Sequence, residues 1–110
     1  MRNYLHVRDA ANAFVFAMEN FGKMKGHTFN CGLSDANLSK IELCEKIKEH
    51  IPGFTYLEAP IGIDPDKRNY LVSNEKIESF GYKPRYSIDD GIEELIKAYS
   101  IIKNSSYGNV

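Results

Sequence analysis

The chain carries RNYLHVRDAA at residues 2–11, and this stretch combines the two patterns from which the fold can be predicted. Apolar and polar side chains alternate over residues 3–7, which is typical of a short strand. Asp9 follows as the expected N-cap of a helix over residues 10–20. The apolar positions of that helix recur at helical spacing, at Ala13, Phe14, Ala17, Met18 and Phe21. The stretch therefore predicts a strand that leads directly into a helix.

Short strands and helices continue through the remainder of the chain. We expect strands at residues 27–31 and 54–59, loops at 22–26 and 60–67, and an extended piece at 70–72. Three helices should follow the serines at positions 39, 73 and 87, and end near Ile51, at Gly81 and near Ile102. Glu42 and Asp90 stand where a capping box places its acidic residue. The order predicts a small mixed α/β domain over residues 1–103, with a frayed tail at 104–110.

Composition excludes several classes of function. The 110 residues, of which 43% are hydrophobic, suffice for one domain with a modest core. With 14 basic and 15 acidic residues well mixed, the chain has no basic stripe for nucleic acid. No apolar run is long enough to span a membrane, and the first residues do not form a signal peptide, so we expect a cytoplasmic protein. Cys31 and Cys44 lack the spacing of a zinc site, and we interpret them as free thiols rather than metal ligands.

The opening stretch resembles the R-[DN]-[YF]-[ILV]-[HY]-V-x-D-[VLA]-A element of the extended short-chain dehydrogenase/reductase family, the NAD-dependent sugar-nucleotide epimerases and dehydratases. A second segment, DPDKRNYLVSNEKI at residues 64–77 with FGYKP at 80–84, resembles the C-terminal signature of that family. SIDDGI at residues 87–92 resembles its final capped helix. The resemblance implies that residues 2–103 correspond to the C-terminal substrate-binding portion of such an enzyme, with the Rossmann core largely absent.

The same resemblance implies roles for three residues in binding a nucleotide sugar. Arg2 matches the arginine that reaches the diphosphate, and a guanidinium fork suits phosphate oxygens. Arg68 matches a second arginine of dehydratase-like members, and its alternative is a solvated loop charge. Tyr70 matches a position beside the sugar ring, where an aromatic side chain can stack on the sugar or simply pack. We interpret His6 as a packed or exposed histidine rather than a general base.

The family's catalytic and cofactor-binding elements are not found in this sequence. In the family, NAD(P) sits on a GxxGxxG turn, and no such turn occurs among these residues. Tyr99 and Lys103 have the spacing of the family's catalytic Tyr-x-x-x-Lys, but they lie in the predicted last helix, where such neighbours are ordinary. We therefore assign no catalytic, cofactor-binding or metal-binding residue, and expect the chain by itself to bind no NAD(P) and to be inactive.

These interpretations lead to two hypotheses from different classes. In the first, the chain is the sugar-nucleotide-binding portion of an NAD(P)-dependent epimerase or dehydratase, and its partners are a nucleotide-sugar substrate and an N-terminal cofactor-binding domain. In the second, it is a non-catalytic, stand-alone binding or assembly module that partners a separate cofactor-binding chain. A generic α/β domain that matches the motifs by chance is a third reading. Exposed apolar surface should also cause self-association.

Overall fold

The computed structural model describes residues 1–58 and 69–102. Within these ranges it has five helices and one two-stranded sheet, which makes it a small mixed domain of helices and sheet, as predicted. The elements are β1 (Arg2–Asn3), α1 (Val7–Glu19), α2 (Phe21–Met24), β2 (Asn37–Leu38), α3 (Lys40–His50), α4 (Glu75–Ser79) and α5 (Ile88–Ile101). The strands are antiparallel, and Arg2 lies opposite Leu38.

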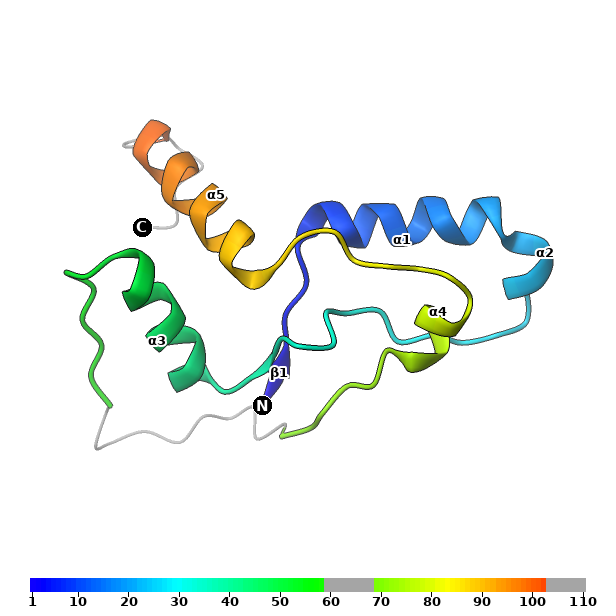
Figure 1. Cartoon of the computed structure of the whole chain (residues 1–110), viewed down its shortest axis with the longest axis horizontal. Helices are drawn as coiled ribbons and strands as arrows, with labels where there is room; N and C mark the ends of the chain where they lie inside the picture. The colour runs from blue at the N-terminus through cyan, green and yellow to red at the C-terminus, as the bar shows by residue number, and fades with distance from the viewer. Residues whose placement is uncertain (59–68, 103–110) are drawn as a thin grey trace.

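Two groups of helices lie at opposite ends of an elongated molecule, which measures 48 × 33 × 26 Å (Figure 1). One end holds α1, α2 and α4, and the other holds α3 and α5, with β1 between them. The core of the first end is a cluster of Met24, Ile77 and Tyr82. Its partly buried neighbours include aromatic, alanine and cysteine side chains: Ala13, Phe16, Ala17, Phe29, Cys31 and Phe80.

The first helix begins earlier than the sequence pattern predicts. His6 is its N-cap, because the backbone is extended at this residue and its Nδ1 accepts a hydrogen bond from the Arg8 N–H at 3.1 Å. The prediction that Asp9 caps the helix is therefore wrong. Asp9 lies in the first turn, where its carboxylate is completely buried and accepts hydrogen bonds from the N–H groups of Arg85 and Tyr86. The local sequence pattern suggests that Asp9 is an N-cap, but its carboxylate instead accepts hydrogen bonds from residues 85 and 86.

The predicted strands are shorter than expected or absent in the described part of the chain. The strand over residues 3–7 reduces to β1, and residues 27–31 and 54–58 form no strand. Residue 59, the end of the last predicted strand, lies outside the described residues, as does the loop over 60–67. Alternation of side chains describes the two faces of a strand, but a strand also needs a neighbour for its backbone hydrogen bonds. Among the described residues, only β1 and β2 pair with each other as neighbouring strands.

The predicted helices after Ser39 and Ser87 are confirmed, and both have complete capping boxes. Each serine Oγ accepts from the backbone N–H three residues later, and the acidic residue there accepts from the serine N–H. These backbone hydrogen bonds hold the pKa values of the Glu42 and Asp90 carboxyls below their usual range. The short helix α4 differs, because Asn74 rather than Ser73 precedes it. Residues 22–24, which we expected to lie in a loop, belong to α2.

A cluster of charged side chains joins α3 to α5. His50 Nε2 lies 2.9 Å from Asp89 Oδ1, and Lys46 Nζ lies 3.4 Å from Asp89 Oδ2. The hydrogen bond from His50, together with Lys46, lowers the pKa of the Asp89 carboxyl. Asp89 thus links both groups on α3 to the first turn of α5.

We expect the stability of the protein to fall in acid. The folded-state pKa values of Glu42, Asp89 and Asp90 lie below their ordinary values of about 4, so protonation favours the unfolded state. The three carboxylates contribute fully to the free energy of unfolding at pH values above their ordinary pKa range. This contribution is lost as the pH falls through their lower folded-state pKa values. Urea unfolding between about pH 7 and pH 3 measures this loss. Asp89→Asn should flatten the acid limb, whereas Glu49→Gln, at an exposed position on α3, should not.

Candidate functional site

Two of the three residues expected to bind a nucleotide sugar lie next to each other. The guanidinium carbon of Arg2 lies 6.0 Å from the centroid of the Tyr70 ring, although the two residues are far apart in the sequence. Arg2 is held in β1, and Tyr70 stands in the extended segment that precedes α4. Arg68, the third expected residue, lies outside the described residues. The structure therefore brings a cation and an aromatic ring together at one edge of the sheet.

The side-chain amide of Asn37 fixes the segment that carries Tyr70. Its Oδ1 accepts from the Val72 N–H at 3.0 Å, and its Nδ2 donates to the Val72 carbonyl at 3.1 Å. An amide that both accepts from and donates to one residue imitates the pairing of a neighbouring strand. The N-terminal ammonium of Met1 also donates to Asn69 Oδ1 at 2.9 Å. These hydrogen bonds hold the segment that carries Tyr70 against β2 and the N-terminus.

A polar cavity of about 380 Å³ opens beside Tyr70. Its lining joins β1, the extended segment after α2 and the segment before α4: Asn3, Leu5, Phe29, Asn30, Cys31, Tyr70 and Val72. This volume lies within the range of small-molecule sites, about 300–1,000 Å³. The lining offers hydrogen-bond donors and acceptors together with an aromatic surface, which is a combination that suits a sugar or a nucleotide.

Two further asparagines shape this cavity. The Asn3 side chain donates to the Leu33 carbonyl at 2.7 Å and accepts from the Leu33 N–H at 3.1 Å. Asn30 Nδ2 donates to the Ser73 carbonyl at 3.2 Å. Sequence analysis missed these asparagines and Asn37, because an asparagine that supports a loop has no characteristic spacing. Of the three asparagines, only Asn3 lies inside the opening motif, and only its position could have drawn attention to it.

Cys31 borders the cavity but is unsuited to nucleophilic chemistry. Both cysteines are free, as expected, and burial raises the pKa of the Cys31 thiol. Burial also raises the pKa of Tyr82, whose hydroxyl donates to the Asp9 carbonyl at 2.9 Å. Near neutral pH the Cys31 thiol is therefore protonated and supplies no thiolate to the cavity, whereas Tyr82 lies in the core and does not line it.

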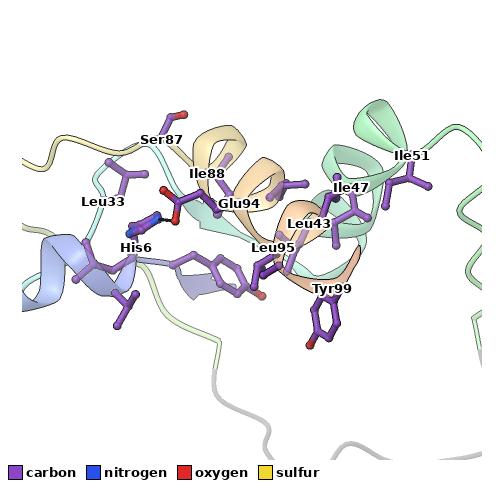
Figure 2. Close-up of a pocket in the computed structure, with 17 residues that line it drawn as sticks. His6, Leu33, Leu43, Ile47, Ile51, Ser87, Ile88, Glu94, Leu95 and Tyr99 are labelled. Atoms are coloured by element: carbon purple, nitrogen blue, oxygen red, sulfur yellow. Dashed lines mark hydrogen bonds and ion pairs between the residues drawn. The ribbon is translucent and has the colours of Figure 1, made fainter. Parts of the chain in front are cut away.

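A larger, apolar groove of about 680 Å³ lies between α3, α5 and residues 4–7 (Figure 2). Figure 2 shows aliphatic side chains of the two helices facing it, among them Leu43, Ile47 and Leu95. Tyr99 also lines the groove and is more than half exposed. Its sequence partner Lys103 lies outside the described residues, so that pair stays untested.

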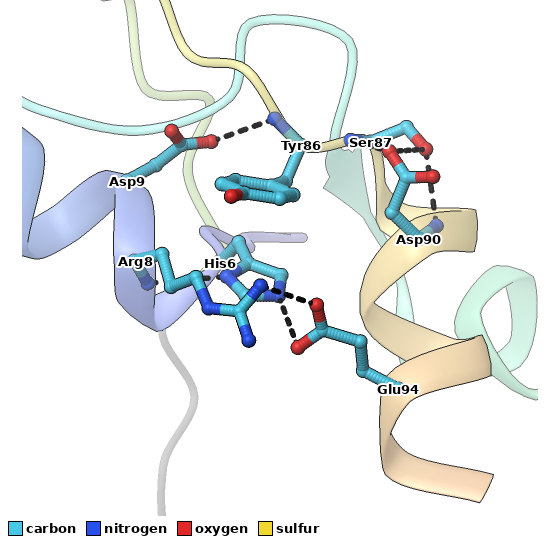
Figure 3. A network of polar contacts seen from close by, with 7 residues as sticks. All are labelled: His6, Arg8, Asp9, Tyr86, Ser87, Asp90 and Glu94. Carbon is cyan, nitrogen blue, oxygen red and sulfur yellow. Dashed lines mark hydrogen bonds and ion pairs between the residues drawn. The ribbon is translucent and has the colours of Figure 1, made fainter. Parts of the chain in front are cut away.

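A network of polar contacts includes His6 and Glu94, which line the groove (Figure 3). Because His6 Nδ1 accepts from a backbone N–H, its Nε2 carries the ring proton and donates to Glu94 Oε2 at 3.2 Å. Arg8 donates to the other Glu94 oxygen at 2.8 Å, and the Tyr86 ring stacks on His6 with centroids 4.4 Å apart. Both ring nitrogens of His6 are therefore occupied. The interpretation of His6 as a packed residue agrees with this geometry.

The described residues contain no cluster of histidine, cysteine or acidic side chains that could hold a metal ion. In the same part of the chain, no helix is long and apolar enough to cross a membrane. The candidate site is the polar cavity lined by Tyr70, with Arg2 against the Tyr70 ring.

Comparison with known proteins gives relatives along nearly the whole chain. No family model matches. The chain is 32% identical over 100 residues to probable GDP-L-fucose synthase 1 of Oryza sativa subsp. japonica, covering 90% of this chain and 29% of the relative. It is 26% identical over 98 residues to CDP-paratose 2-epimerase of Salmonella typhi, covering 86% of the chain and 29% of the relative. The chain is similar to nucleotide-sugar enzymes.

A third relative is the low-salt glycan biosynthesis protein Agl12 of Haloferax volcanii, which is 28% identical over 103 residues. The match covers 90% of this chain and 31% of that protein. The chain thus spans less than a third of the length of the curated relatives that it matches. Their names agree with the resemblance to extended short-chain dehydrogenase/reductase enzymes.

Proposed function

We propose that this chain is the sugar-nucleotide-binding portion of an NAD(P)-dependent epimerase or dehydratase of the extended short-chain dehydrogenase/reductase family. The observation that carries the proposal is the contact between Arg2 and the ring of Tyr70, a residue that lines a polar cavity. The similarity to a GDP-L-fucose synthase and a CDP-paratose 2-epimerase supports it, because both of those names contain a nucleoside diphosphate sugar.

In this proposal, Arg2 binds the diphosphate and Tyr70 covers the sugar or the base. A guanidinium group donates two parallel hydrogen bonds to phosphate oxygens, and its stacking on an aromatic ring limits its motion. The amides of Asn3 and Asn30 border the cavity, where they can orient hydroxyl groups of the sugar. Arg68 is the proposed second diphosphate contact. Binding of this kind positions a sugar carbon for chemistry that other groups carry out.

The residues present do not fit the NAD(P) that such enzymes use. Pyrophosphate binding requires a glycine-rich turn between a strand and the start of a helix. The connection from β1 to α1 is Tyr4-Leu5-His6, and the imidazole of His6 already accepts from the free N–H of Arg8. We therefore assign no step of hydride transfer to these residues and propose that the chain alone has no turnover.

Titration calorimetry with GDP-L-fucose tests the proposal. We expect binding that Arg2→Ala weakens by about 10-fold or more, since a charge-assisted hydrogen bond contributes about 1.5–3 kcal/mol. If the Tyr70 ring covers the sugar, Tyr70→Ala should weaken the binding of GDP-L-fucose more than the binding of GDP. Arg85→Ala, at an exposed arginine outside the lining of the cavity, is the control and should bind normally.

Two results would contradict the proposal. Absence of binding to GDP-, CDP- and UDP-linked sugars by a folded chain would remove its basis. Stoichiometric NAD(P) after purification, or interconversion of a nucleotide sugar by the chain alone, would contradict the assignment as a binding portion without catalysis.

The apolar groove favours a second candidate function, a non-catalytic module that assembles with a separate cofactor-binding chain. Its lining is almost entirely aliphatic or aromatic, and an open apolar surface of this size is typical of a protein contact. Leu95→Asp on α5 separates the candidates. It should abolish assembly with such a chain and leave the binding of GDP-L-fucose unchanged, because Leu95 does not line the polar cavity.

A further inference from the structure

Two segments that are far apart in the sequence line the polar cavity. We call Phe29, Asn30 and Cys31, in the extended segment after α2, the first wall. Tyr70 and Val72, in the segment before α4, form the second wall. Neither wall belongs to a strand, so no sheet ladder fixes the position of either one among the described residues. The amide of residue 37 holds the second wall, and the first wall needs a support of its own.

Two side chains tie the first wall to the beginning of α4. Asn30 Nδ2 donates to the Ser73 carbonyl at 3.2 Å, and Lys76 Nζ donates to the Thr28 carbonyl at 2.8 Å. The Lys76 ammonium also lies over the Phe29 ring, 5.0 Å from its centroid. Ser73 directly follows the second wall in the sequence. These contacts therefore join the two walls at one place, beside α4 (Figure 1).

Lys76 supports the first wall in two ways. Its hydrogen bond to the Thr28 carbonyl is assisted by the ammonium charge and holds the backbone at the start of the wall. Its attraction to the π-electrons of Phe29 holds a ring that lines the cavity. The same ring meets Phe80 at an angle of 81°, with the two centroids 5.0 Å apart. The Phe29 ring thus contacts both Phe80, which packs against the core cluster, and the ammonium group.

We propose that Lys76 is a positioning residue of the polar cavity, which sets the separation of the two walls and thereby the affinity for a nucleotide sugar. This inference rests on the proposed function, because it concerns the same site. Lys76 is exposed and does not line the cavity, so it acts through Thr28 and Phe29 rather than on the ligand. A segment with few contacts can open locally while the core stays folded. Loss of the ammonium group should therefore free the first wall without unfolding the chain.

Titration calorimetry of the whole chain with GDP-L-fucose tests this proposal. Lys76→Met keeps an unbranched side chain but removes its charge. It should weaken binding about 5-fold or more, because the first wall loses a cation–π contact and a charge-assisted hydrogen bond. Lys76→Arg retains a cation with N–H donors and should restore most of the affinity. Lys83→Met, at another exposed lysine outside the lining of the cavity, is the matched control and should bind normally.

Nuclear magnetic resonance of the free chain separates positioning from a direct attraction between Lys76 and the diphosphate. Without ligand, Lys76→Met should shift and broaden the amide signals of residues 28–31, whereas Lys83→Met should leave them unchanged. Amide signals that do not respond to Lys76→Met, or an affinity for GDP-L-fucose that this variant does not lower or that Lys76→Arg does not restore, overturn the role of Lys76. The proposed function fails in a different way, when the folded, unaltered chain binds no nucleotide sugar.

Discussion

Replacement of Asp9 by alanine is expected to destabilise the protein by about 3 kcal/mol or more, since a buried donor left without an acceptor costs about 1–3 kcal/mol. The Asp9 carboxylate is 0% exposed and accepts from the Arg85 N–H at 3.0 Å and from the Tyr86 N–H at 2.9 Å. Alanine leaves both donors unpaired and removes a negative charge from the first turn of α1. In urea unfolding the midpoint should fall without a large change in slope.

Two variants show whether the effect belongs to these hydrogen bonds. Asp9→Asn keeps the shape and one acceptor, so it should cost less than alanine, although its amide N–H group meets a backbone donor. Glu19→Ala removes an exposed carboxylate from the same helix and should change stability by less than about 0.5 kcal/mol. If Asp9→Ala were as mild as Glu19→Ala, the carboxylate would not be the link between α1 and the segment before α5.

Gly32→Ala is expected to cost about 2–3 kcal/mol and to disrupt the polar cavity, because overpacking alone costs about 1–3 kcal/mol. Gly32 is buried, and a Cβ built there overlaps the Asn3 carboxamide, with Asn3 Cγ only 2.7 Å away. Asn3 cannot move aside without losing both hydrogen bonds to Leu33. Since Asn3 lines the cavity beside Arg2, the variant should lose stability in urea and affinity for GDP-L-fucose together.

A double-mutant cycle identifies the clash as the cause. Asn3→Ala removes the same two hydrogen bonds and the atoms that a new Cβ would meet, so adding Gly32→Ala to it should cost little more. Gly53→Ala is the control, because a Cβ there has open space around it. Full additivity of the two changes would show that Gly32 is required for a reason other than the position of Asn3.

Residues that interact within four positions made much of the fold predictable. The boxes at Ser39 and Ser87 predict the starts of α3 and α5 correctly, because the partners of each cap lie three residues apart. Asp9 shows where this reasoning ends. Its acidic side chain at the start of a helix suggests a cap, but its hydrogen-bond donors belong to residues 76 and 77 positions away. The strands failed for a similar reason, since an alternating pattern does not supply a neighbouring strand.

The candidate site was predictable to the extent that motif residues carry charge or an aromatic ring. Arg2 and Tyr70 belong to two separate motifs, and the structure places them 6.0 Å apart. The asparagines that build the cavity were not predictable, because Asn37 acts by imitating a strand partner for Val72 rather than by contributing charge. Such a role depends on which backbone groups lie near the side chain, and this is known only from the folded structure.

The buried carboxylate of Asp9 also has a consequence for the order of events during synthesis. Residues 85 and 86 must have left the ribosome before Asp9 can be paired, and Glu94 must follow before His6 has its own partner. Until then the first helix has the local hydrogen bonds of its turns but no fixed position. Contacts between segments so distant in sequence close large loops, and folding dominated by such contacts is slow. We therefore expect the nascent N-terminal half to stay unfolded on the ribosome, exposing its apolar helix to chaperones until the last helix emerges.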